Sequence, residues 1–240
     1  MEKKKTKDVA ILVMAGKGER LYQSLHVKKQ FYKLDGKELF LYSLETLVLS
    51  ECFREIVLVL SPEDEEHVRT LLKGNKIFSR KKISFVPGGK TRNESVFNAL
   101  KSLKKTKGDF FVLIHDAARP FLSIEQVRNI LSKTYRADAL TYCLPVADSL
   151  FRDDTNGISY LDRKNLFLVQ TPQVFDYRKL LAIYEGGYDP NGTDDFSKAV
   201  HCGLKTLPLI GDLTLFKVTG KEDLHLLKRF SACQGKGEAD

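Results

Sequence analysis

The chain has 240 residues, of which 42% are hydrophobic and 29% are charged. These values are typical of one sizeable α/β domain, and no apolar stretch approaches the roughly 18 residues that a membrane span requires. The formal net charge of +8 is compatible with nucleic-acid binding or with small polyanionic substrates. Because the basic residues are spread along the chain and form no helix-turn-helix, RRM or zinc-finger pattern, small anions are the favoured ligands, and nucleic acid is not an expected partner.

The first residues and the cysteines favour a soluble, cytoplasmic protein. Lysines precede a short apolar run that ends in a loop without a plausible cleavage site, which predicts a core strand rather than a signal peptide. The four cysteines are scattered along the chain, with no CxxC pair. Such thiols are typical of a reducing compartment and predict neither a zinc site nor a disulfide framework.

Strand-like apolar runs alternate with helical patterns over the first part of the chain. Strands are expected at residues 9–14, 55–60, 83–86, 110–116 and 137–146. A helix is expected near residues 38–50, and further helices follow the second, third and fourth strands. Ser61 and Ser123 are expected to cap two of them, with Pro62 at the first position of the former. Apolar strands that each precede a helix predict a mostly parallel sheet with helices on both faces.

The pattern changes at about residues 147–170, where an "RDDTNG" turn separates two short alternating runs. This segment is expected to form a protruding β-arm that serves an oligomer partner or a substrate. Helices are expected near residues 176–185 and 194–202 and from about 221, with short strands near 206–209 and 215–218. No linker divides the sequence, so we expect a single α/β, Rossmann-like domain over residues 1–240.

Ligands of an open α/β sheet bind outside the carboxyl ends of its strands, so the residues that follow each strand are the candidates for a site. The first strand is followed by "AGKGER", in which Gly16 and Gly18 permit backbone N–H groups to approach an anion closely. The loop matches neither the dinucleotide fingerprint nor the Walker pattern, and taken alone it fits an ordinary glycine turn equally well. Arg20, Lys28 and Lys29 lie nearby in the sequence, and these cations suit a triphosphate.

Two further strand ends carry polar residues. "PGGKTRNES" follows the third strand, and its glycines suit backbone approach to a base or ribose, although a tight turn with a Thr91 or Asn93 cap fits as well. "HDAARPF" follows the fourth strand, where Asp116 and Arg119 suit a magnesium–phosphate site, because Mg²⁺ takes oxygen ligands and substrate phosphates. A structural Asp116–Arg119 ion pair with His115 packed nearby is the alternative. No nucleophile motif accompanies His115, so no catalytic role is assigned to it.

Several motifs occur in order along the chain: AGxGxR, KQF, GGxxRxxS, HDAARP, a PVxD[ST] strand end, TPQxF, a late TD and KVTxxEDL. In this combination the sequence closely resembles the 2-C-methyl-D-erythritol 4-phosphate cytidylyltransferase family of non-mevalonate isoprenoid biosynthesis, over roughly residues 9 to 230. HDAARP with TPQxF is specific to this family and its nearest relatives, whereas AGxGxR is shared with sugar nucleotidyltransferases generally. The resemblance implies a homodimer with interlocked arms, a Mg²⁺ cofactor, and transfer of a cytidylyl group from CTP to the polyol phosphate with release of pyrophosphate.

The resemblance also implies roles for individual residues. Arg20 and Lys29 would clamp the triphosphate and stabilise the transition state, and Arg163 and Lys217 complete the expected catalytic set. The expected nucleotide-binding residues are Ala15, Gly16, Gly18, Gly88, Gly89, Ser95, Asp116, Ala118 and Arg119, with Asp116 also the expected Mg²⁺ ligand. The expected contacts to the polyol phosphate are Ser149, Arg163, Thr171, Thr193 and Lys217. Arg163 would reach across from the arm of the second subunit.

Four residues depart from the family pattern. Met14 replaces the usual alanine beside the phosphate loop, and Ser149 keeps the hydroxyl of the usual threonine. Lys28 replaces the usual proline, which raises the question of whether Lys28 or Lys29 reaches the phosphate, and the KQF register favours Lys29. Lys90 stands where an aspartate is common, and a lysine cannot accept a hydrogen bond from a base amino group.

Two other functions remain open from the sequence. Ribitol 5-phosphate cytidylyltransferases share the fold and chemistry but commonly have a different small residue in the HDxxRP loop, so "HDAARP" favours methylerythritol phosphate. A non-catalytic protein that binds nucleotides or nucleic acid would also use the glycine loops and the net charge of +8. Turnover with CTP and each polyol phosphate distinguishes the three functions.

Overall fold

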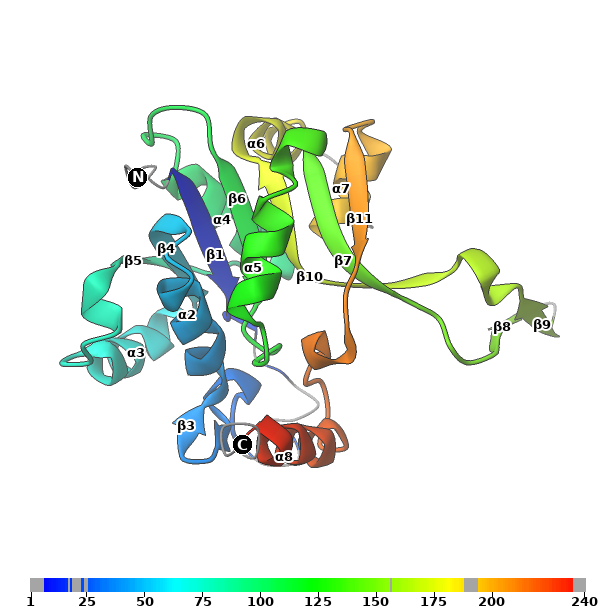
Figure 1. Cartoon of the computed structure of the whole chain (residues 1–240), viewed down its shortest axis with the longest axis horizontal. Coiled ribbons are helices and arrows are strands. Elements are labelled where there is room, and N and C mark those ends of the chain that lie inside the picture. Colours follow the sequence, from blue (N-terminus) through cyan, green and yellow to red (C-terminus); the bar gives the residue numbers. More distant parts are fainter. Residues whose placement is uncertain are drawn as a thin grey trace.

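The computed structural model describes residues 7–16, 18, 23, 26–155, 157–187 and 194–234. Within these residues, seven strands form one sheet in the order β11-β7-β10-β6-β1-β4-β5 (Figure 1). β10 runs antiparallel to both of its neighbours, and the other neighbouring pairs are parallel, so the parallel strands end at one edge of the sheet. The strands are β1 (Asp8–Val13), β4 (Phe53–Leu60), β5 (Lys82–Pro87), β6 (Phe111–Asp116), β7 (Ala139–Pro145), β10 (Phe167–Asp176) and β11 (Thr206–Ile210).

Both faces of the sheet are apolar, because successive residues of a buried strand point to opposite faces. In β1, Ala10 and Leu12 belong to one hydrophobic core, and Val9 and Ile11 belong to the other. Side chains of three helices complete the first core: α2 (Leu39–Leu49), α3 (Glu65–Leu72) and α5 (Ile124–Leu131). The second core is completed by α4 (Arg92–Ser102), α6 (Tyr177–Glu185) and α7 (Asp195–His201). Helices therefore cover both faces, which confirms the architecture expected from the sequence.

Capping residues fix where two of these helices begin. The hydroxyl of Thr91 caps α4, and Ser123 caps α5 within a complete capping box, so both satisfy backbone donors that a first helical turn leaves unpaired. The sequence also predicts a cap at Ser61, and Ser61 does occupy the N-cap position before Pro62, but its side chain makes no capping hydrogen bond. A short 3-10 helix, η2 (Pro62–Asp64), precedes α3, and Ser61 Oγ donates instead to the carbonyl of Ala15 at 3.1 Å.

Two hairpins extend the fold beyond the central sheet. β2 (Lys33–Leu34) pairs with β3 (Lys37–Glu38), and the last helix, α8 (Asp223–Gln234), contacts β2. β8 (Leu150–Asp154) pairs with β9 (Gly157–Leu161), and this arm projects away from the sheet (Figure 1). A 3-10 helix, η5 (Arg163–Asn165), lies between β9 and β10. The arm occupies the residues for which the sequence predicts a protruding hairpin.

Two parts of the fold differ from the sequence expectation. The pattern gave no indication of β10, which lies inside the sheet between β7 and β6. The strand expected near residues 215–218 is absent from the described structure, where η6 (Leu213–Leu215) is followed by irregular backbone. Val218 N–H donates to the carbonyl of Ala118 at 2.9 Å, so this segment bonds to the turn after β6 rather than to a strand. None of the helices in the described ranges has the length and apolar character needed to cross a membrane.

Candidate active site

The loop after β1 is tied to the neighbouring strand β4. Met14 N–H donates to the carbonyl of Val59 at 2.8 Å, and the carbonyl of Ala15 accepts from Ser61 Oγ at 3.1 Å. These bonds hold the start of the loop at the carboxyl edge of the sheet, where open α/β sheets bind ligands.

Lys29 lies against this loop. Gly18 has a φ of 62°, and a Cβ built on it would lie 3.1 Å from Lys29 Cγ and 3.2 Å from Lys29 Cδ. The Lys29 stem therefore crosses the backbone at Gly18, where both the φ angle and the contact favour glycine. Among the described residues, no atom lies within 4 Å of a Cβ built on Gly16. Arg20, the other expected triphosphate ligand, lies outside the described residues.

Lys28 has a different environment. Its Nζ donates to both carboxylate oxygens of Asp64 at 2.7 Å and to Glu63 at 3.1 Å. Burial alone would lower the pKa of Lys28, but the hydrogen bonds to Asp64 and Glu63 raise it above its ordinary value, so Lys28 stays charged. Its charge is matched by carboxylates on η2. The choice of Lys29 over Lys28 as the residue that reaches the phosphate stays a prediction.

The glycine loop after β5 packs on the loop after β1. A Cβ on Gly88 would lie 2.2 Å from the Cβ of Ala15, so any side chain at residue 88 would collide with it. Gly89 N–H donates to Ser95 Oγ at 3.0 Å, and Ser95 is buried. Of the two caps that the sequence left open, Thr91 is the one that forms. Ser95 thus holds the loop in place, and its contact with a nucleotide stays a prediction.

Asp116 forms the charged centre of the site. Lys217 Nζ donates to its Oδ2 at 2.6 Å, and Arg92 Nε donates to its Oδ1 at 3.2 Å. The carboxylate side chain is only 9% exposed. Burial alone would raise the pKa of Asp116, but the nearby cations, Arg92 foremost, hold it well below its usual range. Asp116 is therefore ionised at neutral pH.

Arg119 joins residues 215–218 to the turn after β6. Its Nη1 donates to the carbonyl of Leu215, and Val218 N–H donates to the carbonyl of Ala118 at 2.9 Å. These two bonds lay the segment along the turn after β6 and place Lys217 beside the carboxylate. The alternative weighed from the sequence, an ion pair between the aspartate and arginine of HDAAR, is not among the contacts of the described residues.

His115 and Thr171 join β6 to β10. Thr171 Oγ1 accepts from the backbone N–H of Asp116 at 3.2 Å and lies 3.2 Å from His115 Nδ1, and His115 Nε2 lies 3.0 Å from the carbonyl of Arg119. Because a carbonyl only accepts, Nε2 carries the proton and Nδ1 accepts from Thr171. Burial lowers the pKa of His115 to about 4, so the ring is neutral at pH 7. Both side chains are buried links, and contact between Thr171 and a substrate stays a prediction.

Arg92 had no expected role, although it lies within the GGxxRxxS motif. Arg92 Nη1 donates to Asp195 Oδ2 at 2.8 Å, and Asp195 is fully buried at the start of α7. Tyr184 OH donates to the other oxygen of Asp195, and Lys198 Nζ lies 3.8 Å away. Arg92 therefore bridges Asp116 to a second buried carboxylate. Asp116 and Asp195 lie far apart in the sequence, so no local pattern predicts that one arginine joins them. The arginine of the GGxxRxxS motif was the only sequence feature that pointed to this residue.

Two of the expected polyol contacts lie on the arm. Ser149 is exposed just before β8, and the Arg163 guanidinium at the start of η5 donates to the carbonyl of Ala147. The arm projects away from the sheet (Figure 1). Among the contacts of the described residues, neither Ser149 nor Arg163 bonds to Asp116 or Lys217. Thr193, a further expected contact, lies outside the described residues.

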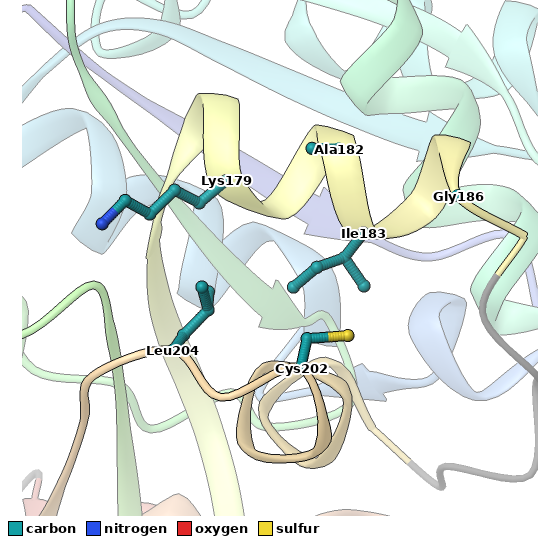
Figure 2. Close-up of a pocket in the computed structure, with 6 residues that line it drawn as sticks. All are labelled: Lys179, Ala182, Ile183, Gly186, Cys202 and Leu204. Carbon is teal, nitrogen blue, oxygen red and sulfur yellow. The ribbon is translucent and has the colours of Figure 1, made fainter.

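A pocket of about 540 Å³ lies at the opposite edge of the sheet. Lys179, which lines it, forms an ion pair with Asp138, the residue that precedes β7, and this places the pocket near the amino ends of the parallel strands. None of the expected site residues that the structure describes lines it. Its lining residues are Lys179, Ala182, Ile183, Gly186, Cys202 and Leu204 (Figure 2).

Asp116 is the residue that could hold a metal ion. In the part of the chain that the structure describes, no three His, Cys, Asp or Glu side chains form a group suited to a metal. A single ionised carboxylate, which offers more lone pairs than its two hydrogen bonds use, suits Mg²⁺, because this ion is usually held by one or two carboxylates and by substrate phosphates. The residues therefore fit a magnesium ion shared with a triphosphate.

Comparison with known proteins adds to this geometry. The family model of 2-C-methyl-D-erythritol 4-phosphate cytidylyltransferase matches residues 9–230. The chain belongs to this family. It is 40% identical over 221 residues to the enzyme of that name from Thermotoga neapolitana, which covers 92% of this chain and 95% of the relative. It is 30% identical over 233 residues to that from Clostridioides difficile, which covers 96% of each chain.

Solved structures of the cytidylyltransferase family share the fold. The 4-diphosphocytidyl-2C-methyl-D-erythritol synthase from Anaerococcus prevotii superposes with a TM-score of 0.79 at 25% identity, over 94% of this chain and 98% of that one. The 2-C-methyl-D-erythritol 4-phosphate cytidylyltransferase from Francisella tularensis gives a TM-score of 0.75 at 26% identity, over 93% and 99%. The likeness extends over nearly the whole chain.

The carboxyl edge of this cytidylyltransferase-family chain combines backbone donors with cations. Two glycine loops touch there, Lys29 crosses one of them, and Lys217 lies beside an ionised carboxylate. His115, which directly precedes Asp116 in the sequence, is buried and neutral with both nitrogens bonded. The arrangement suits a reaction that needs alignment and charge stabilisation more than proton transfer by the protein.

Proposed function

We propose that this chain transfers a cytidylyl group from CTP to 2-C-methyl-D-erythritol 4-phosphate and releases pyrophosphate. Family membership indicates the reaction and the substrates. In the structure, the observation that carries the proposal is the Lys217–Asp116–Arg92 cluster beside the first glycine loop, since Asp116 at the end of β6 pairs with Val13 at the end of β1. The cysteines that the structure describes are free thiols, which suits the reducing cytoplasm, where we propose that the reaction takes place.

The reaction requires little proton chemistry from the protein. An oxygen of the 4-phosphate attacks the α-phosphorus of CTP, a new phosphorus–oxygen bond forms, and the bond to the leaving pyrophosphate breaks. Negative charge therefore builds up on the phosphoryl oxygens and on pyrophosphate. Cations fixed in advance stabilise this charge without reorganising, and they offset the repulsion between two anionic substrates that must approach each other in line.

The nucleotide would lie across the two glycine loops. Lys29, which crosses Gly18, would bind the triphosphate where pyrophosphate forms, and this role is supported by the contact between its stem and the loop. The backbone of Gly88 and Gly89 would receive the nucleoside. Arg20 keeps its expected role as a second ligand of the triphosphate.

The polyol phosphate would approach from the side of Lys217. The Lys217 ammonium would contact the attacking phosphate and would stabilise the negative charge of the transition state. Asp116 would hold Mg²⁺ together with triphosphate oxygens, which is supported by its depressed pKa and by the Arg92 guanidinium that fixes it. When bound, the ion supplies further neutralisation of the phosphate charge. Thr171 and Thr193 keep their expected contacts with the polyol phosphate.

We further propose that two copies of the chain exchange their arms. Large apolar residues are exposed on the arm and at its base, and monomeric proteins rarely expose apolar patches of this extent. The arm also carries Ser149 and Arg163, so the arm of a second copy would complete the polyol site. The exposed residues are Phe151, Ile158, Tyr160, Leu161, Phe167, Leu168 and Val169.

The test is product formation from defined substrates. The purified chain is incubated with CTP, 2-C-methyl-D-erythritol 4-phosphate and Mg²⁺, pyrophosphate release is followed, and the nucleotide product is identified by mass spectrometry. We expect one pyrophosphate per cytidylylated polyol and no release when either substrate is omitted. Asp116→Asn should lower turnover about a hundredfold or more while circular dichroism stays unchanged. Absence of product from the wild-type chain would overturn the proposal.

A further inference from the structure

A closed series of contacts links the two ends of the glycine loop after β1. The Ala15 carbonyl accepts from Ser61 Oγ at 3.1 Å, and the Ser61 carbonyl accepts from Asp64 N–H at 2.9 Å across the turn of η2. The Asp64 carboxylate accepts from Lys28 Nζ at 2.7 Å. Lys28 directly precedes the lysine whose stem packs on Gly18. The series thus leaves the loop near its start and returns to it near its far end.

The Lys28–Asp64 ion pair holds its two side chains in a fixed relative position. The side chain of Lys28 is 20% exposed and that of Asp64 is 10% exposed, so water screens the pair much less than an ordinary surface ion pair. Both oxygens of Asp64 accept from the same ammonium, and such charge-assisted hydrogen bonds are short and strong. Removing Lys28 would leave the carboxylate of Asp64, which is only 10% exposed, without this cation.

Lys28 also begins the turn that carries Lys29. Phe31 N–H donates to the Lys28 carbonyl at 2.9 Å, which closes the 3-10 helix η1 (Lys29–Phe31). A lysine side chain has many rotamers, so the place of its ammonium depends strongly on where the backbone fixes its base. Fixing Lys28 therefore narrows the range of positions that the Lys29 ammonium can reach.

We propose that Lys28 and Asp64 form a brace that positions Lys29 for the triphosphate. The inference rests on the proposed cytidylyl transfer, because the brace acts on substrate through Lys29. Lys28 is a positioning residue in this account, since its own charge is already matched by Asp64 and Glu63. The brace also gives Lys28 a function at a position where the family pattern has proline.

Two variants remove the brace from opposite sides. Because displacements of about 1 Å at a reacting centre can cost about a hundredfold in rate, Lys28→Met and Asp64→Asn should each lower kcat/KM for CTP about tenfold. The KM for the polyol phosphate should stay within about twofold of the wild-type value. Calorimetric titration with CTP and Mg²⁺, without the second substrate, should show about tenfold weaker binding. Asp64→Asn is the decisive variant, because it keeps the Lys28 cation. If Lys28 bound phosphate directly, it would retain that contact in this variant.

An exchange variant and a matched control complete the test. Lys28→Asp combined with Asp64→Lys restores an ion pair of reversed polarity, and kcat/KM for CTP should return to within about threefold of wild type. If Lys28 bound phosphate itself, the exchange would be at least as damaging as Lys28→Met. Lys82→Met is the control, because it removes a 2.7 Å ion pair with Glu55 near the amino end of β5. It should leave the kinetics unchanged.

The outcomes separate the brace from the proposed function. Wild-type kinetics and CTP binding in both single variants, or an exchange variant that shows no recovery, would overturn the brace. If Lys28→Met fails to fold in a thermal melt, Asp64→Asn and its CTP titration decide. A wild-type chain that releases no pyrophosphate would sink the proposed function, and weaker CTP binding in the variants would then still support the brace.

Discussion

Replacing Lys217 by methionine separates a catalytic role from a structural one. The variant keeps most of the side-chain bulk but removes the ammonium that lies 2.6 Å from Asp116 Oδ2, while Arg92 Nε stays 3.2 Å from the other oxygen. The Lys217 side chain is 32% exposed, so losing this hydrogen bond should lower the free energy of unfolding by only about 1–2 kcal/mol. Since domains are typically stable by about 5–15 kcal/mol, at least about 3 kcal/mol would remain, and about 99% of the molecules would stay folded.

The effect of Lys217→Met on turnover should be much larger. Removing a fixed donor that stabilises transition-state charge typically lowers kcat about a hundred- to a thousandfold, which corresponds to about 3–4 kcal/mol. Unfolding cannot produce such a loss in a protein that stays folded. Pyrophosphate release at saturating substrates and urea unfolding are measured on the same preparation, with Lys82→Met as the control. A kcat within about fivefold of wild type would refute the role of Lys217 at the reacting phosphate.

Three further predictions concern the loops, the core and the arm. Gly88→Ala brings a methyl group to 2.2 Å from the Cβ of Ala15 and should lower the affinity for CTP at least about tenfold. Adding Ala15→Gly removes the collision and should recover part of the lost affinity. If the affinity does not recover, the defect does not come from this collision. In metal-free protein, burial lowers the pKa of His115 to about 4 from 6.5, so the unfolded chain binds a proton first as the pH falls. The stability that neutral His115 contributes is therefore full above pH 6.5 and is lost as the pH falls towards 4. In urea unfolding, the wild-type chain should lose up to about 3 kcal/mol more than His115→Gln over this range. Parallel pH profiles of the two proteins would contradict this. Ile158→Asp with Tyr160→Asp should convert a dimer to monomers in sedimentation, and a wild-type chain that sediments as a monomer would remove the proposed arm exchange.

The parallel strands and their helices could be predicted because their apolar runs and caps are local signals. β10 could not, because "VQTPQV" interrupts its apolar run with a proline and polar residues. Thr171 and Gln173 are buried there by partners that the sequence does not reveal, such as His115 and the carboxylate of Asp194. Residues 215–218 were mistaken for a strand. Leu215 and Val218 are both buried, but the backbone of this segment bonds to Arg119 and Ala118 in the turn after β6 rather than to a strand.

The candidate site was predicted in part. The carboxyl-edge rule and the family resemblance pointed to Lys29, Asp116 and Lys217, and the structure brings the last two together. The Arg92–Asp195 bridge depends on two residues separated by 103 positions, and no local pattern signals such a pair. The ion pair of Lys28 with Asp64 was hidden for the same reason.

Cytidylyl transfer to methylerythritol phosphate, a branched five-carbon polyol phosphate, is tested most directly by a competition between two acceptors. The chain is given CTP and Mg²⁺ with equal concentrations of 2-C-methyl-D-erythritol 4-phosphate and ribitol 5-phosphate, and the two cytidylylated products are separated and counted by mass spectrometry. We expect the methylerythritol product to predominate, with pyrophosphate formed in equal amount. A predominance of the ribitol product, or pyrophosphate release with neither product, would contradict the account.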